Sequence, residues 1–246
     1  GARGLAMGGA VISNQNDVYS PMWNPAGLID IDRDWQGAAM HAEYFESIAK
    51  YDYIAFAKPL DNKGGVFAIS VVRLGVDNIL NTTQLIDSEG NIDYDKITSF
   101  SQSDYAALLS YAFRPGSHRL SVGINAKMVY RNVGKFASGY GFGFDLGVLY
   151  NADNGINYGA MLRDATTTVN FWTVNQDELS AVVNGEEFNP APKDKMEITM
   201  PKLNLGISKN FELNRDLELL PEAGLNIDFA KTAAVISTDF ASITPY

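Results

Sequence analysis

Residues 120–130 read LSVGINAKMVY and residues 139–150 read GYGFGFDLGVLY, and these two stretches decide the fold class. In each of them, apolar side chains alternate with small or polar ones. Successive residues of a β-strand point to opposite faces, so a period of two predicts two strands with one apolar face each. The apolar positions are Leu120, Val122, Ile124, Ala126, Met128 and Tyr130 in the first strand, and Tyr140, Phe142, Phe144, Leu146, Val148 and Tyr150 in the second.

The same alternation recurs more weakly along the chain and predicts nine strands in all. The other seven cover residues 38–44, 51–58, 64–73, 105–113, 156–163, 203–208 and 219–229. In the first of these, the apolar face consists of Ala38, Met40, Ala42 and Tyr44. We therefore expect His41 and Glu43 to lie on the opposite, inward face.

The connections between the predicted strands alternate between short and long. Tight links lie at 59–63, 114–118, 151–155 and 213–216, and the other connections at 46–50, 74–103, 131–138 and 164–199. Short periplasmic turns and longer extracellular loops are typical of outer-membrane β-barrels. The strand lengths approach the ~9–11 tilted residues that cross a bilayer. Aromatic residues end the apolar faces, as in interfacial girdles, at Tyr105, Phe113, Tyr130, Tyr140 and Tyr150.

A soluble β-sandwich or lipocalin-like barrel is the alternative, because its strands alternate too, with the apolar face turned inward. The glycines that face away from the apolar side of the second stretch argue against it; they are Gly139, Gly141, Gly143 and Gly147. Glycine weakens a solvent-exposed strand, whereas small residues inside a barrel leave room for a plug. The sequence therefore favours an all-β, transmembrane antiparallel barrel whose apolar face is turned to lipid.

The composition argues against several classes of function and site. The net charge of −10 argues against nucleic acid as a partner, because phosphate binding needs clustered Lys and Arg. The chain has no cysteine, so disulfides and thiolate metal sites are excluded. No apolar run reaches the ~20 residues of a spanning helix. The chain starts at Gly1 without a Met or a basic leader, so we expect that a signal peptide has been removed.

No motif for catalysis, a cofactor or a metal emerges, and we expect a protein that is not an enzyme. The glycines of GYGFGFDLG recur every second residue within a strand, unlike those of a phosphate-binding loop. The only histidines are His118, in a predicted turn, and His41, alone on an inward face, so neither a zinc site nor a catalytic triad is expected. Residues 87–95 carry spaced acidic side chains, but the glycine and the terminal glutamate of an EF-hand calcium loop are not in register there. The long loops are acidic, and we read them as solvated surface or as a docking surface; the residues are Asp87, Glu89, Asp93 and Asp95, and Asp177, Glu178, Glu186 and Glu187.

Residues 1–34 do not alternate and contain GARGLAMGGA, Asp17 and the block MWNPAGL. Pro25 fixes its own φ and restricts Asn24, so a short helix or turn is expected to start at Pro25. This segment resembles the N-terminal signature of the PorV/PorQ family, within the wider FadL-like superfamily of outer-membrane proteins. The resemblance is dense over residues 1–34 and only architectural beyond them.

The resemblance implies a 14-stranded FadL-like barrel, formed by residues 35–246, with residues 1–34 as a hatch inside it. The hatch motif would comprise Asp17, Trp23, Asn24, Pro25, Ala26 and Gly27. Nine to ten strands fall short of fourteen, and an open edge would leave unpaired backbone in lipid. We therefore expect the C-terminal strands to be missing from this chain.

The resemblance also implies a role in the type IX secretion system of Bacteroidetes-type Gram-negative bacteria. The protein would be an outer-membrane adaptor, shuttle or complex subunit in protein transport. Its partners would be outer-membrane lipid, secreted cargo proteins and a large translocon barrel, contacted through loops 74–103 and 164–199 and the barrel wall.

Two alternatives stay open: an accessory barrel of another outer-membrane machine, such as the barrel-insertion complex, or a FadL-type transporter of hydrophobic small molecules. Such a transporter needs an apolar pocket beside the hatch and a lateral opening through a kinked strand. The expected inward face is instead polar, at Asn125, Lys127, Asp145, Arg163, Glu222 and Asp228.

Overall fold

A computed structural model describes the chain except for residues 33, 61–63, 88, 117, 180, 184–185, 189–195, 216, 230–235, 238–241 and 246. In the strands at 181–183, 186–188, 236–237 and 242–245 it describes the backbone alone. The described residues form mostly antiparallel β-sheet, dominated by one sheet of 13 strands. None of the helices in this part of the chain is long and apolar enough to cross a membrane.

Strand neighbours in the large sheet follow the chain, so the sheet is built almost entirely of consecutive hairpins. The order is β1-β2-β3-β4-β5-β6-β7-β12-β15-β17-β16, with β8 beside β6 and β11 beside β8. The strands are β1 Gln36–Tyr44, β2 Ala49–Pro59, β3 Val66–Asn81, β4 Thr98–Phe113, β5 Leu120–Val133, β6 Ala137–Asn151, β7 Ile156–Arg163, β8 Thr168–Val174, β11 Met196–Thr199, β12 Lys202–Lys209, β15 Glu222–Asp228, β16 Ile236–Ser237 and β17 Ser242–Pro245. Two small ladders pair β9 (Ala181–Val183) with β10 (Glu186–Phe188) and β13 (Phe211–Asn214) with β14 (Leu217–Leu219).

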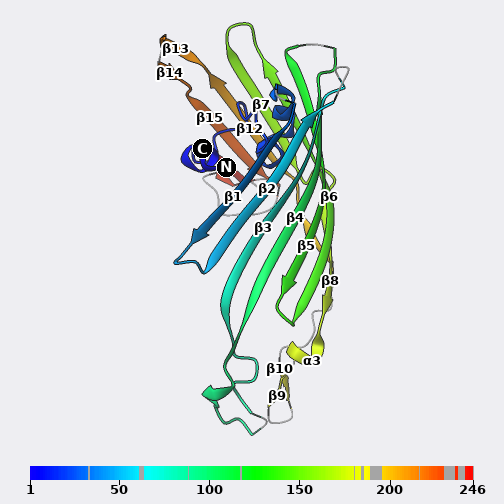
Figure 1. Cartoon of the computed structure of the whole chain (residues 1–246). Coiled ribbons are helices and arrows are strands. Elements are labelled where there is room, and N and C mark those ends of the chain that lie inside the picture. Colours follow the sequence, from blue (N-terminus) through cyan, green and yellow to red (C-terminus); the bar gives the residue numbers. More distant parts are fainter. Residues whose placement is uncertain are drawn as a thin grey trace.

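The N-terminal segment, residues 1–34, contains the short helices α1 (Ala2–Ala6), α2 (Ser20–Trp23) and η1 (Pro25–Asp30). The expected helix at Pro25 is confirmed. Figure 1 shows this segment against one face of the curved sheet, which we call the inner face; the opposite face is the outer face. Buried apolar residues of the segment and of β2, β3 and β4 form the core: Val18, Leu28, Ile31, Tyr53, Ala55, Ala57, Val66, Ala68 and Ala112.

All nine predicted strands are present, but several connections were predicted wrongly. The strands β3 and β4 extend well beyond the predicted ends, so the loop between them covers 82–97 rather than 74–103. Residues 131–138 are not a long loop, since β5 and β6 are joined by a turn at 134–136. Polar residues beyond the apolar stretches still pair through their backbone, which is why apolar alternation underestimates strand length.

The last two predicted connections were also wrong in detail. Residues 164–199 contain β8, β11 and the one-turn helix α3 (Gln176–Leu179), while residues 180, 184–185 and 189–195 of that range lie outside the described residues. The predicted turn at 213–216 lies inside the β13–β14 hairpin, so β12 and β15 are joined by residues 210–221. The strict alternation of short and long connections therefore does not hold.

The strands β7 and β8 behave as one strand interrupted by a kink. Pairing with β6 runs through Leu146↔Leu162, breaks, and resumes at Phe142↔Val169. In the kink at 164–167, Asp164 and Thr167 have positive φ values of 51° and 63°. L-residues seldom adopt this conformation, so surrounding contacts must hold the kink in place.

The outer face carries the apolar side chains of β5 and β6, as predicted. Phe142 is 56% exposed and Phe144 48%, whereas Gly141, Gly143 and Asp145 between them are buried. The prediction for β1 was wrong: Ala38 and Met40 pack against the core, and His41 and Glu43 lie on the outer face. Because the N-terminal segment brings its own apolar side chains to this part of the sheet, the inner face is the apolar one here.

Candidate functional site

The contact between the N-terminal segment and the inner face is the candidate functional site. Its centre is Asn24, which is completely buried. The Asn24 Nδ2 donates to the Ile12 carbonyl at 3.0 Å and to the Val148 carbonyl of β6 at 3.1 Å, while Oδ1 accepts from the Ala26 N–H at 3.2 Å. The Asn24 side-chain amide thus caps η1, links it to the Ile12 carbonyl within the segment, and bonds the segment to the sheet.

Glycines of the inner face let the N-terminal segment approach the sheet backbone to backbone. A Cβ added to Gly123 would lie 2.2 Å from the Ala26 nitrogen, and one on Gly159 would lie 2.3 Å from the Ile12 carbonyl oxygen. A Cβ on Gly147 would lie 2.2 Å from the Asn24 Oδ1. These three glycines, on β5, β6 and β7, therefore provide the space in which the segment sits. The expectation that the β6 glycines leave room for a plug was wrong for Gly139, Gly141 and Gly143, where a Cβ would instead meet Trp172, Asn170 and Thr168 of β8.

Valine at Gly123 is expected to displace the segment. The valine side chain would collide with backbone atoms, which cannot move aside by changing a side-chain rotamer. We expect this overpacking to cost about 1–3 kcal/mol. Limited proteolysis of the folded protein should show faster cleavage within residues 1–31 while β5 keeps its protection. The control is Ala126→Val, which adds similar bulk to the outer face of the same strand. Equal cleavage of the two variants would contradict the close packing.

Polar side chains of four strands and a backbone carbonyl of β6 hold the segment on the inner face. The Glu222 carboxylate of β15 accepts from the Ser13 N–H and hydroxyl, both at 2.9 Å, and from the Asn14 side-chain amide. The Asn125 Nδ2 of β5 donates to the Pro21 carbonyl at 2.8 Å, and Arg163 donates to the Met22 carbonyl. The strands β6 and β12 add Val148 and Ser208, the latter 2.7 Å from the Ser13 hydroxyl.

A charged cluster fills the kink between β7 and β8. The Lys127 ammonium lies 3.0 Å from Asp145 and 2.5 Å from Asp164, and all three side chains are largely buried. The Asp145 carboxylate also accepts from the Asp164 N–H at 2.9 Å, and Thr168 donates to Asp164. One ammonium is therefore shared by two carboxylates and helps to fix Asp164, a residue with positive φ. Sequence reasoning missed Asp164, because it falls in a predicted loop and no local pattern marks it.

The remaining predicted site residues lie mainly within the N-terminal segment. Asp17 Oδ1 accepts from the Tyr19 N–H at 2.8 Å, and a Cβ on Gly27 would overlap the Gln15 carbonyl oxygen. The Trp23 ring packs over Gly4. Asp228 pairs with Lys202 at 3.0 Å on β15 and β12. Pro25 and Ala26 are buried in η1.

A half-polar cavity of about 290 Å³ lies between the N-terminal segment and β7, β12 and β15. Its lining includes Ile12 and Trp23 from the segment and Arg163, Lys202 and Asn204 from the strands. Ligand pockets for apolar molecules are mostly lined by hydrophobic side chains, and this one is not.

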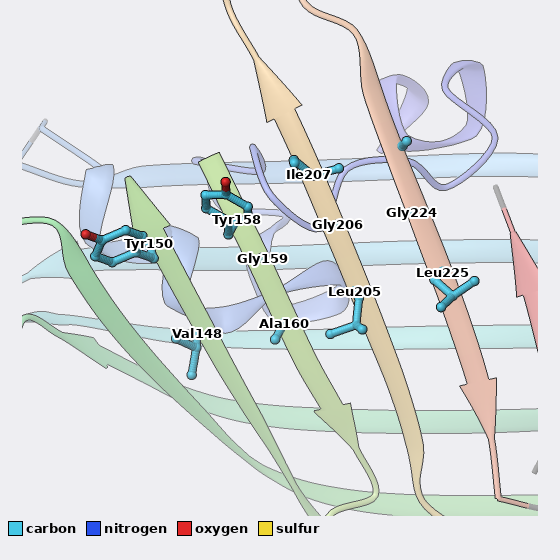
Figure 2. A pocket seen from close by; sticks show the side chains of 11 residues that line it. Val148, Tyr150, Tyr158, Gly159, Ala160, Leu205, Gly206, Ile207, Gly224 and Leu225 are labelled. Atoms are coloured by element: carbon cyan, nitrogen blue, oxygen red, sulfur yellow. The ribbon is translucent and has the colours of Figure 1, made fainter. Parts of the chain in front are cut away.

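An apolar groove of about 520 Å³ lies on the outer face, over β6, β7, β12 and β15. Figure 2 shows its lining, in which Ala160 leaves space between the larger side chains of Tyr150, Tyr158, Leu205 and Ile207. The groove would accept an aliphatic chain lying along the sheet.

The acidic loop 82–97 has a fixed turn centred on Asp87. Its carboxylate accepts from the Asn91 N–H and the Glu89 N–H, both at 2.9 Å, and from the Asn91 amide. These hydrogen bonds hold the pKa of Asp87 below its usual range, and the bond from the Asn91 N–H contributes most. Among the residues that the structure describes, no group of three acidic or histidine side chains could hold a metal ion.

The turn is expected to loosen at low pH. A depressed folded-state pKa means that the stabilisation is present above the usual Asp pKa and is lost as pH falls through the folded-state value. Amide exchange at Asn91 should therefore accelerate, relative to intrinsic exchange, in strong acid, and Asp87→Ala should produce the same acceleration at pH 7. Glu89→Ala keeps the Glu89 N–H and should leave exchange unchanged.

Comparison with protein-family models and with curated proteins found no match to this chain.

Proposed function

We propose that this chain forms the wall of a transmembrane β-barrel in the outer membrane of a Gram-negative, Bacteroidetes-like bacterium, with the N-terminal segment as its hatch. The observation that carries the proposal is the distribution of side chains over the two faces. The outer face of β5 and β6 exposes aliphatic and aromatic residues, while the buried polar groups are on the inner face and bind the segment.

The dimensions of the exposed apolar face support a membrane. Six outward apolar positions on each of β5 and β6 span 11 residues. At ~3.3 Å per residue and a tilt of roughly 40°, this covers roughly 25–28 Å, close to the apolar band of about 25 Å on outer-membrane barrels. Tyr130 and Tyr140 stand at one end of this face, Leu120 and Tyr150 at the other. A soluble monomer seldom exposes so large a continuous apolar patch.

We further propose that the barrel is a PorV-like adaptor or subunit of a protein-export complex and does not catalyse a reaction. The hatch signature around Asn24 supports this, together with the dense contacts that keep the hatch seated. Secreted cargo and a translocon barrel would be bound by the barrel wall and by the loops that follow β3 and β8, the first of which is acidic and ordered around Asp87.

FadL-type transport of hydrophobic molecules is the second candidate, because the β7–β8 kink is the kind of interruption that a lateral opening needs. Two observations weigh against it. The kink is filled by Lys127 and its two carboxylates, and the cavity beside the segment is half-polar.

Purification of the full-length protein in mild detergent separates the two functions. An adaptor should co-purify with large membrane partners and carry no fatty acid. A stable monomer with bound fatty acid would establish transport instead. The barrel itself is tested by heat-modifiable migration on gels, and a helical circular dichroism spectrum would refute it.

A further inference from the structure

The outer face of β1, β2 and β3 differs from that of the other strands. Consecutive outward apolar positions number six on each of β5 and β6, but only three on β3 before Arg73 and two on β2. Those on β3 are Phe67, Ile69 and Val71, and those on β2 are Ile54 and Phe56. The outward positions of β1 up to His41 hold only Gly37 and Ala39.

On the outer face of β1, β2 and β3, charged side chains occupy the positions that follow the apolar ones. His41, Asp52 and Arg73 are direct neighbours on β1, β2 and β3. The His41 Nδ1 lies 2.6 Å from Asp52 and the Arg73 guanidinium 2.9 Å from it. Glu43 lies 3.2 Å from the His41 Nε2. We call these four residues the outer charged patch; next to it, Lys50 pairs with Asp77 at 2.8 Å.

The patch lies at the depth of the apolar band. Tilted strands are staggered, so depth is counted from the end of each strand that carries the short turn. Asp52 and Arg73 are each seven residues from that end of β2 and β3. On β6 the residue that lies seven positions from the short-turn end of the strand is Phe144, in the middle of the apolar face. Charged side chains facing lipid at such a depth are unfavourable.

A hollow adjoins the patch because the β1 side chains are small. Its volume is about 630 Å³, and it is lined by Ala39, His41, Ile54, Val71, Arg73 and Tyr105. The patch and its Lys50–Asp77 neighbour hold three carboxylates against two permanent cations, so the area is net negative when His41 is neutral. Glu43 is its most exposed carboxylate, with a side chain 45% exposed.

We propose that the outer face of β1–β3 docks against the wall of a second outer-membrane protein, which places a basic side chain into this hollow. The proposal rests on the proposed membrane function, because only in a membrane is lipid the alternative neighbour. The partner's cation meets Glu43 and Asp52, and the flanking Ile54 and Val71 pack against its apolar side chains. Protein contact replaces lipid in this sector, and the charges stay hydrogen-bonded.

Photocrosslinking in outer membranes of cells that make the full-length protein tests the proposal. The photoreactive residue p-benzoylphenylalanine replaces Ile54 in one variant and Phe144 in the other. The Ile54 probe should give one high-mass adduct with an outer-membrane protein, and the Phe144 probe should give none. Adding Glu43→Lys or Ala39→Arg, which reverse the charge or fill the hollow, should reduce the Ile54 adduct at least tenfold. Glu43→Gln should reduce it less.

Equal adducts from the two probes, an adduct between two copies of this chain, or an Ile54 adduct that survives Glu43→Lys would each overturn the docking surface. Heat-modifiable migration of every variant is measured in parallel. If the Ile54 probe protein without a second substitution migrates as a folded barrel but gives no adduct, the docking surface alone is refuted. If the parent protein lacks heat-modifiable migration, the membrane barrel itself is refuted.

Discussion

Lys127→Met is expected to lower the free energy of unfolding by about 3–5 kcal/mol, the usual cost of removing one partner from a buried ion pair. The ammonium is the only cation in the described structure within bonding distance of Asp145 and Asp164. Without it, two carboxylates face each other in a largely buried site. The Asp164 side chain, which belongs to a residue with positive φ, also loses a contact that holds the kink.

Urea titration of the protein refolded into lipid vesicles measures this loss. The control is Lys135→Met, at an exposed lysine of the β5–β6 turn that pairs with Glu178; surface pairs of this kind contribute about 0–1 kcal/mol. The double variant Lys127→Met/Asp164→Asn should recover part of the stability, because it removes one of the two uncompensated charges. If Lys127→Met unfolds at the same urea concentration as Lys135→Met, the cluster does not stabilise the kink.

Phe144→Arg is expected to cost about 2–4 kcal/mol in a bilayer, the range for Arg or Lys on the lipid face at the midplane. Phe144 is 48% exposed on the outer face and stands between Phe142 and Leu146. Phe142→Arg, one outward position closer to Tyr140, should cost less, because the cost falls toward the interface.

The same titration in vesicles checks this prediction, with Phe144→Leu as the apolar control. On a water-exposed surface, arginine would be neutral for stability and would improve solubility. A Phe144→Arg protein that inserts and unfolds like the Leu variant would therefore contradict the lipid-facing assignment and, with it, the proposed function.

Alternation predicted the strands well because it is a local property. The pleat alone sends Phe142 and Gly143 to opposite faces, whatever the rest of the chain does. The apolar side of β5 and β6 was also predicted correctly, since glycine on the other side indicated close packing, against the N-terminal segment at Gly147 and against β8 at Gly139, Gly141 and Gly143. The helix start at Pro25 followed from the fixed φ of proline.

Strand ends and connections were predicted less well. Residues 131–138 became a three-residue turn, and polar residues at the far ends of β3 and β4 paired although no apolar pattern marks them. Backbone hydrogen bonds between neighbours decide where a strand stops, and the neighbour is not visible in the local sequence.

The sequence by itself determined the period-two strands, the glycine-lined face of β6 and the proline-led turn of the N-terminal segment, because each depends on residues close together in the chain. Only the tertiary structure decided that β1 turns His41 outward, that Asn24 bonds a carbonyl of β6, and that Lys127 meets Asp164 at a kink. The physical reason is that these outcomes depend on which strands pair and on what covers each face, and both are set by contacts between residues far apart in sequence.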